Sequence, residues 1–157
     1  MKSTAKNGSE AFISRCRGAG LSVTRQRLAI YDAMMTNCAC HPSAEVIYKA
    51  VRNRYPTISF NTIYKNLELF EELGLVVKVN PLYNEARYDT DVHPHHHLIC
   101  RQCKLIVDVH DKQLDRLPAP EEAADGFEVE NWTVQFTGLC SRCRTALGSL
   151  RPAAATA

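Results

Sequence analysis

Residues 93–103 have the sequence HPHHHLICRQC, and a second Cys-x-x-Cys pair follows at Cys140 and Cys143. Two turn-sized cysteine pairs, joined by a span that can fold back, supply the four thiolates of a closed tetrahedral Zn²⁺ site. The sequence therefore predicts a structural zinc site at Cys100, Cys103, Cys140 and Cys143. The alternative is a thioredoxin-like redox centre at each pair, which the absence of a βαβ context around either pair disfavours.

The histidines of this stretch indicate a second and chemically different metal site. His95 and His97 are two residues apart, so in a strand their side chains project to the same face. Asp108 alternates with valines in the next strand-like run and could reach them. Spacing makes His95 and His97 a plausible ligand pair. On spacing alone, His41-Pro42 could equally open a helix, and a solvated carboxylate is an equal interpretation of Asp89 and of Asp108.

Length and composition indicate a soluble globular protein. The 157 residues, 45% of them apolar and 23% charged, suffice for one domain or two small ones. The sequence contains no apolar run of membrane-spanning length and no secretory signal at its N-terminus, which predicts a cytoplasmic protein. In that compartment the seven cysteines are metal ligands and free thiols rather than disulfides. Cys16, Cys38 and Cys40 are interpreted as partly buried free thiols.

The net charge of +2 conceals an asymmetry between the two halves of the chain. Residues 1–80 contain eleven Lys and Arg against six Asp and Glu, a balance of +5, whereas residues 81–157 have a balance of −3. A basic first half and an acidic second half that contains the Cys-x-x-Cys pairs favour separate tasks, contact with a polyanion and metal binding. A solvated basic surface without a nucleic-acid role is the alternative.

Hydrophobic periodicity in the first half predicts four helices and a hairpin. The helices are expected over residues 9–18, from an N-cap at Thr24 to residue 35, from an N-cap at Ser43 towards Pro56, and from an N-cap at Ser59 to residue 73. Strands over residues 75–79 and 85–89 complete a winged helix-turn-helix. Val46, Ile47 and Ala50 are predicted to be the buried stripe of the third helix, and Ile63, Leu67 and Phe70 that of the fourth.

The opposite face of the fourth helix is the candidate DNA-binding surface. In a winged helix this element enters the major groove, and it would present Asn61, Tyr64 and Lys65 to base edges and phosphates. The alternative is an ordinary amphipathic surface helix.

In the second half, strands are expected over residues 97–100, 104–110 and 128–139, with a short helix over 114–124.

The chain resembles the ferric uptake regulator (Fur) family, and within it the peroxide-sensing (PerR) branch, over about residues 10–145. The resemblance rests on the motifs Leu21-Ser22-Val23-Thr24-Arg25-Gln26-Arg27, His41-Pro42-Ser43-Ala44, Thr62-Ile63-Tyr64, Arg87-Tyr88-Asp89, His95 to Cys103 and the final Cys140/Cys143 pair. It implies an α+β protein with an N-terminal winged helix-turn-helix DNA-binding domain (residues 1–88). A small α/β dimerisation domain with the four-cysteine zinc site (residues 89–147) and a disordered tail (residues 148–157) follow.

The resemblance also implies a regulatory metal site that holds Fe²⁺ or Mn²⁺. Its ligands would be His41, Asp89, His95, His97 and Asp108. Aspartate at position 108 favours the peroxide-sensing branch, since iron-uptake regulators usually have glutamate there. A further site of many iron regulators uses a histidine where this chain has Trp132, so that site is not expected.

The implied function is that of a homodimeric repressor of palindromic operators, which senses peroxide through iron-catalysed oxidation of His41 or His95. One alternative is an iron-responsive or zinc-responsive repressor that uses the metal only as corepressor. A metalloenzyme built on His95, His97 and a carboxylate is the other, but no general base or substrate-binding motif accompanies those ligands. The chain is thus expected to be no enzyme, and to bind neither a membrane nor a small organic substrate.

Overall fold

The computed structural model describes residues 3–37, 41–79, 86–118, 129 and 131–148. The chain divides into two compact units, Met1–Val92 and His93–Ala157. Cys38, Cys40, the whole of the predicted hairpin loop, and residues 149–157 of the predicted tail lie outside the described residues. Among the helices that are described, none combines the length and apolarity needed to cross a membrane.

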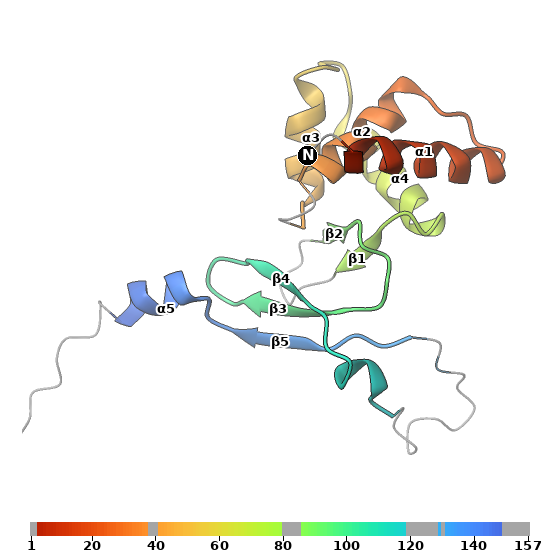
Figure 1. The fold of residues 1–157 in the computed structure, drawn as a ribbon. Coiled ribbons are helices and arrows are strands. Elements are labelled where there is room, and N and C mark those ends of the chain that lie inside the picture. Colours follow the sequence, from red (N-terminus) through yellow and green to blue (C-terminus); the bar gives the residue numbers. More distant parts are fainter. Residues whose placement is uncertain (1–2, 38–40, 80–85, 119–128, 130, 149–157) are drawn as a thin grey trace, which may run out of the picture. The chain divides into compact units, whose positions relative to one another are not determined.

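The first unit contains four helices followed by a two-stranded antiparallel wing (Figure 1). The helices are α1 (Ser3–Gly18), α2 (Arg25–Thr36), α3 (Ala44–Arg52) and α4 (Phe60–Glu72), and the strands are β1 (Val77–Val79) and β2 (Arg87–Asp89). This order confirms the predicted winged-helix class. The first helix begins before the predicted residue 9, and both strands are shorter than predicted.

Side-chain caps start three of these helices at the predicted residues. The hydroxyl oxygens of Thr24, Ser43 and Ser59 each accept a hydrogen bond from the backbone N–H three residues on. At the other end of α4, Gly74 adopts φ +61°, a conformation that glycine reaches without strain. The Arg15 guanidinium donates to the carbonyl oxygen of Leu73 at 3.0 Å, which places a cation at the negative end of α4.

The core of the first unit is built around three aromatic rings from three helices. Phe12 of α1 stacks on Tyr31 of α2 with ring centroids 4.7 Å apart, and it meets Phe70 of α4 edge-on at 5.2 Å. Ile63 and Leu67 are fully buried with Phe70, as predicted for α4. The aromatic contacts therefore hold α1 and α2 against the inner face of α4, and they leave the outer face of α4 exposed.

The prediction for the buried face of α3 was partly wrong. Ile47 is fully buried as expected, but Val46 is 40% exposed and Ala50 is exposed as well. The buried residues of this helix are Ala44, Ile47 and Val51. Consecutive side chains on a helix diverge by about 100°, so these three share one face and Val46 and Ala50 lie on its flank.

The second unit is a three-stranded sheet with the order β4-β3-β5, followed by a helix. Strand β3 (His96–Cys100) pairs with β4 (Ile106–Val109) antiparallel and with β5 (Gln135–Gly138) parallel. Strand β3 begins one residue before the predicted start, whereas β4 and β5 are shorter than predicted, and α5 (Ser141–Gly148) was not predicted. Gly148, which was predicted to be the first residue of the tail, is the last residue of α5.

The predicted helix over residues 114–124 is a single 3₁₀ turn, η2 (Leu114–Arg116), in the part that the structure describes. Leu117 is already extended, with ψ 128°. Pro118 explains this end, because a residue before proline is driven out of the helical conformation. Residues 119–124 lie outside the described part of the chain.

The orientation of α3 can be tested with two neighbouring alanine substitutions. Ile47→Ala should lower the free energy of unfolding by about 2–5 kcal/mol, because it leaves a cavity in the core. Val46→Ala should change the same quantity by no more than about 0.5 kcal/mol, because the side chain is on the surface. Urea unfolding followed by far-ultraviolet circular dichroism measures both, and equal losses would contradict the orientation described.

Candidate metal centres

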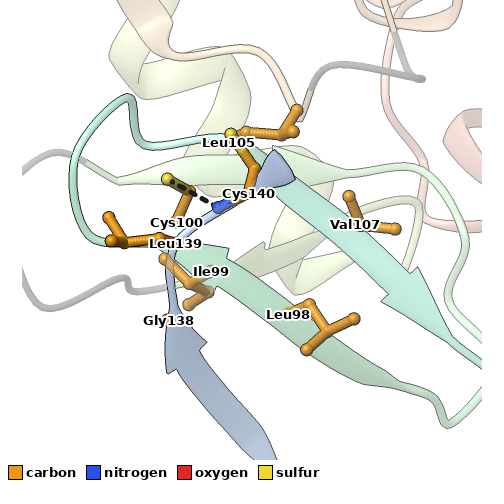
Figure 2. A pocket seen from close by; sticks show the side chains of 8 residues that line it. All are labelled: Leu98, Ile99, Cys100, Leu105, Val107, Gly138, Leu139 and Cys140. Atoms are coloured by element: carbon orange, nitrogen blue, oxygen red, sulfur yellow. Dashed lines mark hydrogen bonds between the residues drawn. The ribbon is translucent and has the colours of Figure 1, made fainter. Parts of the chain in front are cut away.

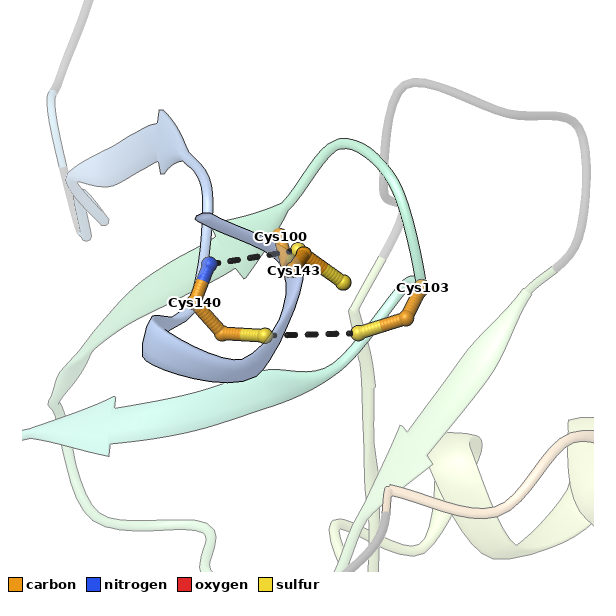
Figure 3. A group of neighbouring side chains, drawn as sticks. All are labelled: Cys100, Cys103, Cys140 and Cys143. Carbon is orange, nitrogen blue, oxygen red and sulfur yellow. Dashed lines mark hydrogen bonds between the residues drawn. The ribbon is translucent and has the colours of Figure 1, made fainter. Parts of the chain in front are cut away.

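Four cysteines from β3, from the segments that follow β3 and β5, and from α5 meet at one end of the sheet (Figure 3). Cys100 ends β3, Cys103 lies in the turn to β4, Cys140 follows β5, and Cys143 lies in the first turn of α5. Because β3 and β5 run parallel with Cys100 paired to Gly138, both strands deliver a cysteine at the same edge. The four Sγ atoms lie within 4.8 Å of one another, and the four residues are free thiols rather than disulfides.

The spacing of these sulfurs fits a tetrahedral ion. The Sγ atoms of Cys103 and Cys140 are 3.7 Å apart. A tetrahedron with metal–sulfur bonds of about 2.3 Å has sulfur–sulfur edges of roughly 3.8 Å. The backbone N–H of Cys140 also donates to the Cys100 sulfur at 3.3 Å (Figure 3). The second cysteine pair is thereby held against the first.

The surroundings of the cluster give its thiols different pKa values. Backbone hydrogen bonds from Cys103 and then Cys140 lower the pKa of Cys100 to about 6, whereas burial raises the pKa of Cys143 to about 12. A hydrogen bond to Cys103 raises the pKa of the Arg142 guanidinium, which lies beside the thiolates. Cys143 therefore keeps its proton at neutral pH unless a cation replaces it, as binding of a metal ion would do.

A row of apolar side chains crosses the sheet beside this cluster. Val107, Leu98 and Phe136 occupy paired positions on β4, β3 and β5, and they are 45%, 48% and 42% exposed. Leu98 and Val107 also line a pocket that reaches Cys100 and Cys140 (Figure 2). These neighbouring apolar side chains make the row a candidate interaction surface.

The predicted histidine pair is assembled in the second unit as the spacing suggested. The rings of His95 and His97 are 4.6 Å apart, and His97 pairs across the strands with Asp108. The Asp108 carboxylate oxygen lies 3.8 Å from Nε2 of His95 and 3.9 Å from Nε2 of His97. Both imidazoles are buried and the carboxylate is partly exposed.

A backbone contact assigns the tautomer of His95. Its Nδ1 lies 2.8 Å from the carbonyl oxygen of His93, which can only accept, so Nδ1 carries the proton. Nε2 of the neutral ring then has its lone pair directed towards the Asp108 side. A histidine fixed in this way by a backbone carbonyl is the usual arrangement of a metal ligand.

The first unit contains a buried pair of the same chemical type. Nε2 of His41 lies 3.0 Å from a carboxylate oxygen of Asp89, and both side chains are buried. The other carboxylate oxygen of Asp89 accepts from the backbone N–H of Asp91 at 2.8 Å. A buried carboxylate beside a buried imidazole needs a positive charge, from a proton on the ring or from a cation.

Backbone pairing brings these two residues together. The segment that follows His41 lies along β2, with a bridge between Ser43 and Arg87 and a hydrogen bond from Tyr88 N–H to the Pro42 carbonyl. Asp89 ends the same strand. His41 has a φ of +45°, which is uncommon for a residue other than glycine and turns the chain into this pairing.

His96 belongs to a separate arrangement on the other face of the sheet. Its Nδ1 accepts from the backbone N–H of Val134 at 3.1 Å, and its Nε2 faces an oxygen of Asp115 at 3.3 Å. The indole N–H of Trp132 donates to the Leu114 carbonyl at 3.1 Å. These contacts tie η2 to the sheet, so His96 has a structural role. All three histidines are buried, so the sequence signal that separates His96 from His95 and His97 is the alternation of side-chain direction along a strand.

The predicted DNA-binding residues all lie on the exposed face of α4. Asn61, Tyr64 and Lys65 are exposed, in the first turns after the Ser59 cap. Sequence reasoning missed that Phe60 is exposed beside them and contacts Tyr64, with ring centroids 5.0 Å apart. The spacing of four residues between two aromatics at the start of a helix was the available signal.

The sequence model of the "Ferric uptake regulator family" matches residues 18–137, most of the chain. The chain belongs to this family. The family consists of metal-dependent transcriptional regulators that bind DNA rather than of enzymes, which confirms the predicted class.

Individual relatives agree with this assignment. The chain is 35% identical over 135 residues to a peroxide-responsive repressor of Staphylococcus epidermidis, which covers 86% of this chain and 89% of the relative. It is 35% identical over 141 residues to the repressor of the same name from Staphylococcus saprophyticus, 90% and 95% of the two chains. The predicted resemblance to the peroxide-sensing branch is thereby confirmed.

Solved structures share the fold. The Campylobacter jejuni peroxide stress regulator is 28% identical, with a TM-score of 0.61 over 85% of this chain and 97% of its own. The Helicobacter pylori ferric uptake regulator has a TM-score of 0.72 at 18% identity, over 92% and 97%. The latter likeness concerns the fold alone.

A pH titration of the metal-free protein tests the charge distribution at the cysteine cluster. Cys100 should ionise near pH 6, below its ordinary value of 9.0. Since folding lowers this pKa, the thiolate stabilises the folded state at high pH, and that contribution is lost as the pH falls from about 9 through about 6. The ultraviolet absorbance of thiolates reports the step. Cys100→Ser should lack it, and a single shared step near pH 9 would contradict the geometry.

Proposed function

We propose that the protein is a peroxide-responsive repressor whose DNA binding depends on a metal ion at His41, Asp89, His95, His97 and Asp108. The observation that carries this proposal is the contact of His95 Nδ1 with the His93 carbonyl, which leaves Nε2 as the ring nitrogen that lies beside Asp108. His97 lies beside the same carboxylate. The relatives named peroxide-responsive repressors support the same conclusion. A repressor of this kind acts on chromosomal DNA, so we expect it in the cytoplasm.

The regulatory site draws its ligands from both units of the chain. His41 and Asp89 come from the first unit, and His95, His97 and Asp108 from the second. Three imidazoles and two carboxylates suit Fe²⁺ or Mn²⁺. Ligands shared in this way hold the winged helix in one orientation, so the metal-loaded form is selected over other arrangements.

The two metal sites differ in donor chemistry and therefore in task. Four thiolates close the coordination shell of Zn²⁺, and a closed shell is structural. The regulatory residues offer nitrogen and oxygen donors and no sulfur. His41, Asp89, His95, His97 and Asp108 would hold the Fe²⁺, and the ion would activate hydrogen peroxide beside them. One peroxide oxygen would be inserted into a C–H bond of the His41 or His95 imidazole, which gives up two electrons, and the other oxygen would leave as water. An oxidised imidazole is a poorer ligand, so the shared site is lost and the repressor leaves DNA.

The DNA-bound form is a homodimer on a palindromic operator. The exposed row of Val107, Leu98 and Phe136 supports pairing of two copies through the sheet, since a second copy buries the apolar surface. Two copies of α4 then enter successive major grooves with Asn61, Tyr64 and Lys65 towards the bases. The metal in each copy fixes the orientation of its winged helix, and this sets the separation of the two α4 helices.

Zinc content tests the structural site. Cys103→Ser should reduce bound zinc from about one ion per chain to a small fraction, because three thiolates no longer close the tetrahedron. Cys16→Ala is the matched control, since Cys16 is buried in the helical core of the first unit, and it should keep its zinc. Elemental analysis of the purified variants gives the result. Equal zinc in both would exclude the cysteine cluster as the zinc site.

Oxidation mapping tests the sensing mechanism. The zinc-containing protein is loaded anaerobically with Fe²⁺, treated with a small excess of hydrogen peroxide, and analysed by peptide mass spectrometry beside a Mn²⁺-loaded sample. One added oxygen should appear on the peptide that contains His41 or His95, with iron only and with the zinc cysteines intact. DNA binding should fall in parallel, as measured by gel mobility.

A pair of variants sharpens this experiment. Asp108→Asn weakens the regulatory site and should abolish the oxidation, whereas Asp111→Asn changes a turn carboxylate that accepts from Gln113 N–H and should leave it intact. Unmodified histidines in the iron-loaded protein would contradict peroxide sensing and favour an iron-responsive repressor. Oxidation confined to the cysteine cluster would indicate a thiol switch instead.

A further inference from the structure

Three aromatic rings join α3 to the exposed face of α4. Phe60, the first residue of α4, meets Tyr48 of α3 edge-on with centroids 5.4 Å apart, and it meets Tyr64 at 5.0 Å with the planes 77° apart. Edge-to-face contacts of this kind restrict the rings in addition to burying area. The contacts therefore connect Tyr64, a predicted DNA-binding residue, to a side chain of the neighbouring helix. We call Tyr48, Phe60 and Tyr64 the aromatic stack.

The stack has a guanidinium at its far end. The Arg52 guanidinium carbon lies 5.7 Å from the centre of the Tyr48 ring, within the range of a cation–π contact. Tyr48, Arg52 and Phe60 line one surface hollow at the end of α3 and the start of α4. The cationic end of the stack is thus continuous with the surface that presents Tyr64.

The two cationic side chains on this part of α3 differ in whether an acidic partner neutralises them. Lys49 forms an ion pair with Glu45 at 2.9 Å, so its charge is partly neutralised. Arg52 forms no ion pair within the part of the chain that the structure describes. A cation–π contact uses the charge of the guanidinium and leaves its N–H donors available for hydrogen bonding to a phosphate.

We propose that Arg52 is a DNA phosphate contact, positioned by the aromatic stack, so that α3 as well as α4 takes part in binding duplex DNA. The inference rests on the proposed binding of DNA by α4. A stacked guanidinium loses less side-chain entropy on binding than a free one. The contact fixes the register of α4 on the duplex without reading sequence. The +5 balance of residues 1–80 suits the same polyanion.

The salt dependence of binding distinguishes a phosphate contact from a structural role. Each phosphate contact contributes about 0.9 to the slope of log affinity against log salt concentration. Arg52→Ala should therefore reduce the slope by about 0.9. The affinity deficit of the variant should shrink about 3.5-fold between 50 and 200 mM salt. Arg52→Lys keeps the charge and should keep the slope.

The chain offers a matched control two residues away. The Arg54 guanidinium lies over the Tyr55 ring at 5.8 Å, and the Tyr55 hydroxyl donates to the Arg25 carbonyl rather than to the aromatic stack. Arg54→Ala removes the same charge and the same kind of contact, and it should leave the slope unchanged. Tyr48→Leu removes the ring under Arg52 and should weaken binding about 2- to 5-fold with the slope retained.

The probe is a duplex that the Mn²⁺-loaded wild-type protein enriches from a random-sequence library. Binding is measured by fluorescence anisotropy over a range of KCl, after circular dichroism has shown equal melting temperatures. An unchanged slope in Arg52→Ala would overturn the inference, as would equal reductions in Arg52→Ala and Arg54→Ala. Failure of the wild-type protein to enrich any duplex would instead overturn the proposed DNA-binding function.

Discussion

The alternation of side chains along β3 is the constraint on which the second unit depends. Successive residues of a strand point to opposite faces, so His97 faces Asp108 while His96 and Leu98 face the other way. Cys100 ends the strand at the cysteine cluster. A shift of register by one residue would exchange the faces and separate His97 from Asp108. One five-residue strand thereby contributes a candidate regulatory ligand, an apolar surface residue and a cysteine of the cluster, each at a different place on the sheet.

The cysteine cluster is what stabilises that register. The sheet is small, and β3 and β5 are separated by more than thirty residues in sequence, so their parallel pairing closes a long loop at an entropic cost. Four thiolates from the ends of β3 and β5, the turn and α5 draw together around one tetrahedral position. An ion bound there would tie both strands at the same edge. Binding energy at such a site is folding energy, so it would add to the stability that the apolar core of the sheet provides.

Much of this arrangement could be predicted because it is local in the sequence. The helix caps at Thr24, Ser43 and Ser59, and the buried stripe of α4, follow from short-range chemistry. The spacing of His95 and His97 and the two Cys-x-x-Cys pairs gave the ligand candidates in the same way. Val46 was misplaced because three apolar residues of α3 compete for one face, and only packing against the neighbouring helices decides which are buried. The parallel pairing of β5, the contacts of His96 with Val134 and Asp115, and the contact of Phe60 with Tyr48 depend on packing between elements, which local spacing does not determine.

The chemistry of the donors keeps the two candidate metal centres apart. Thiolates prefer Zn²⁺, and an all-sulfur site with a closed shell offers a peroxide-reactive metal no open position. The histidine and carboxylate donors lack sulfur, so Fe²⁺ or Mn²⁺ can compete there under conditions where zinc is already taken up by the cysteines. The Asp108 carboxylate is partly exposed while its histidines are buried, so an ion can reach the site from that side. A repressor that must stay folded while its regulatory ion binds and dissociates requires two separate metal sites. Strand alternation also separates His97 from the apolar row, because the two lie on opposite faces of the same sheet.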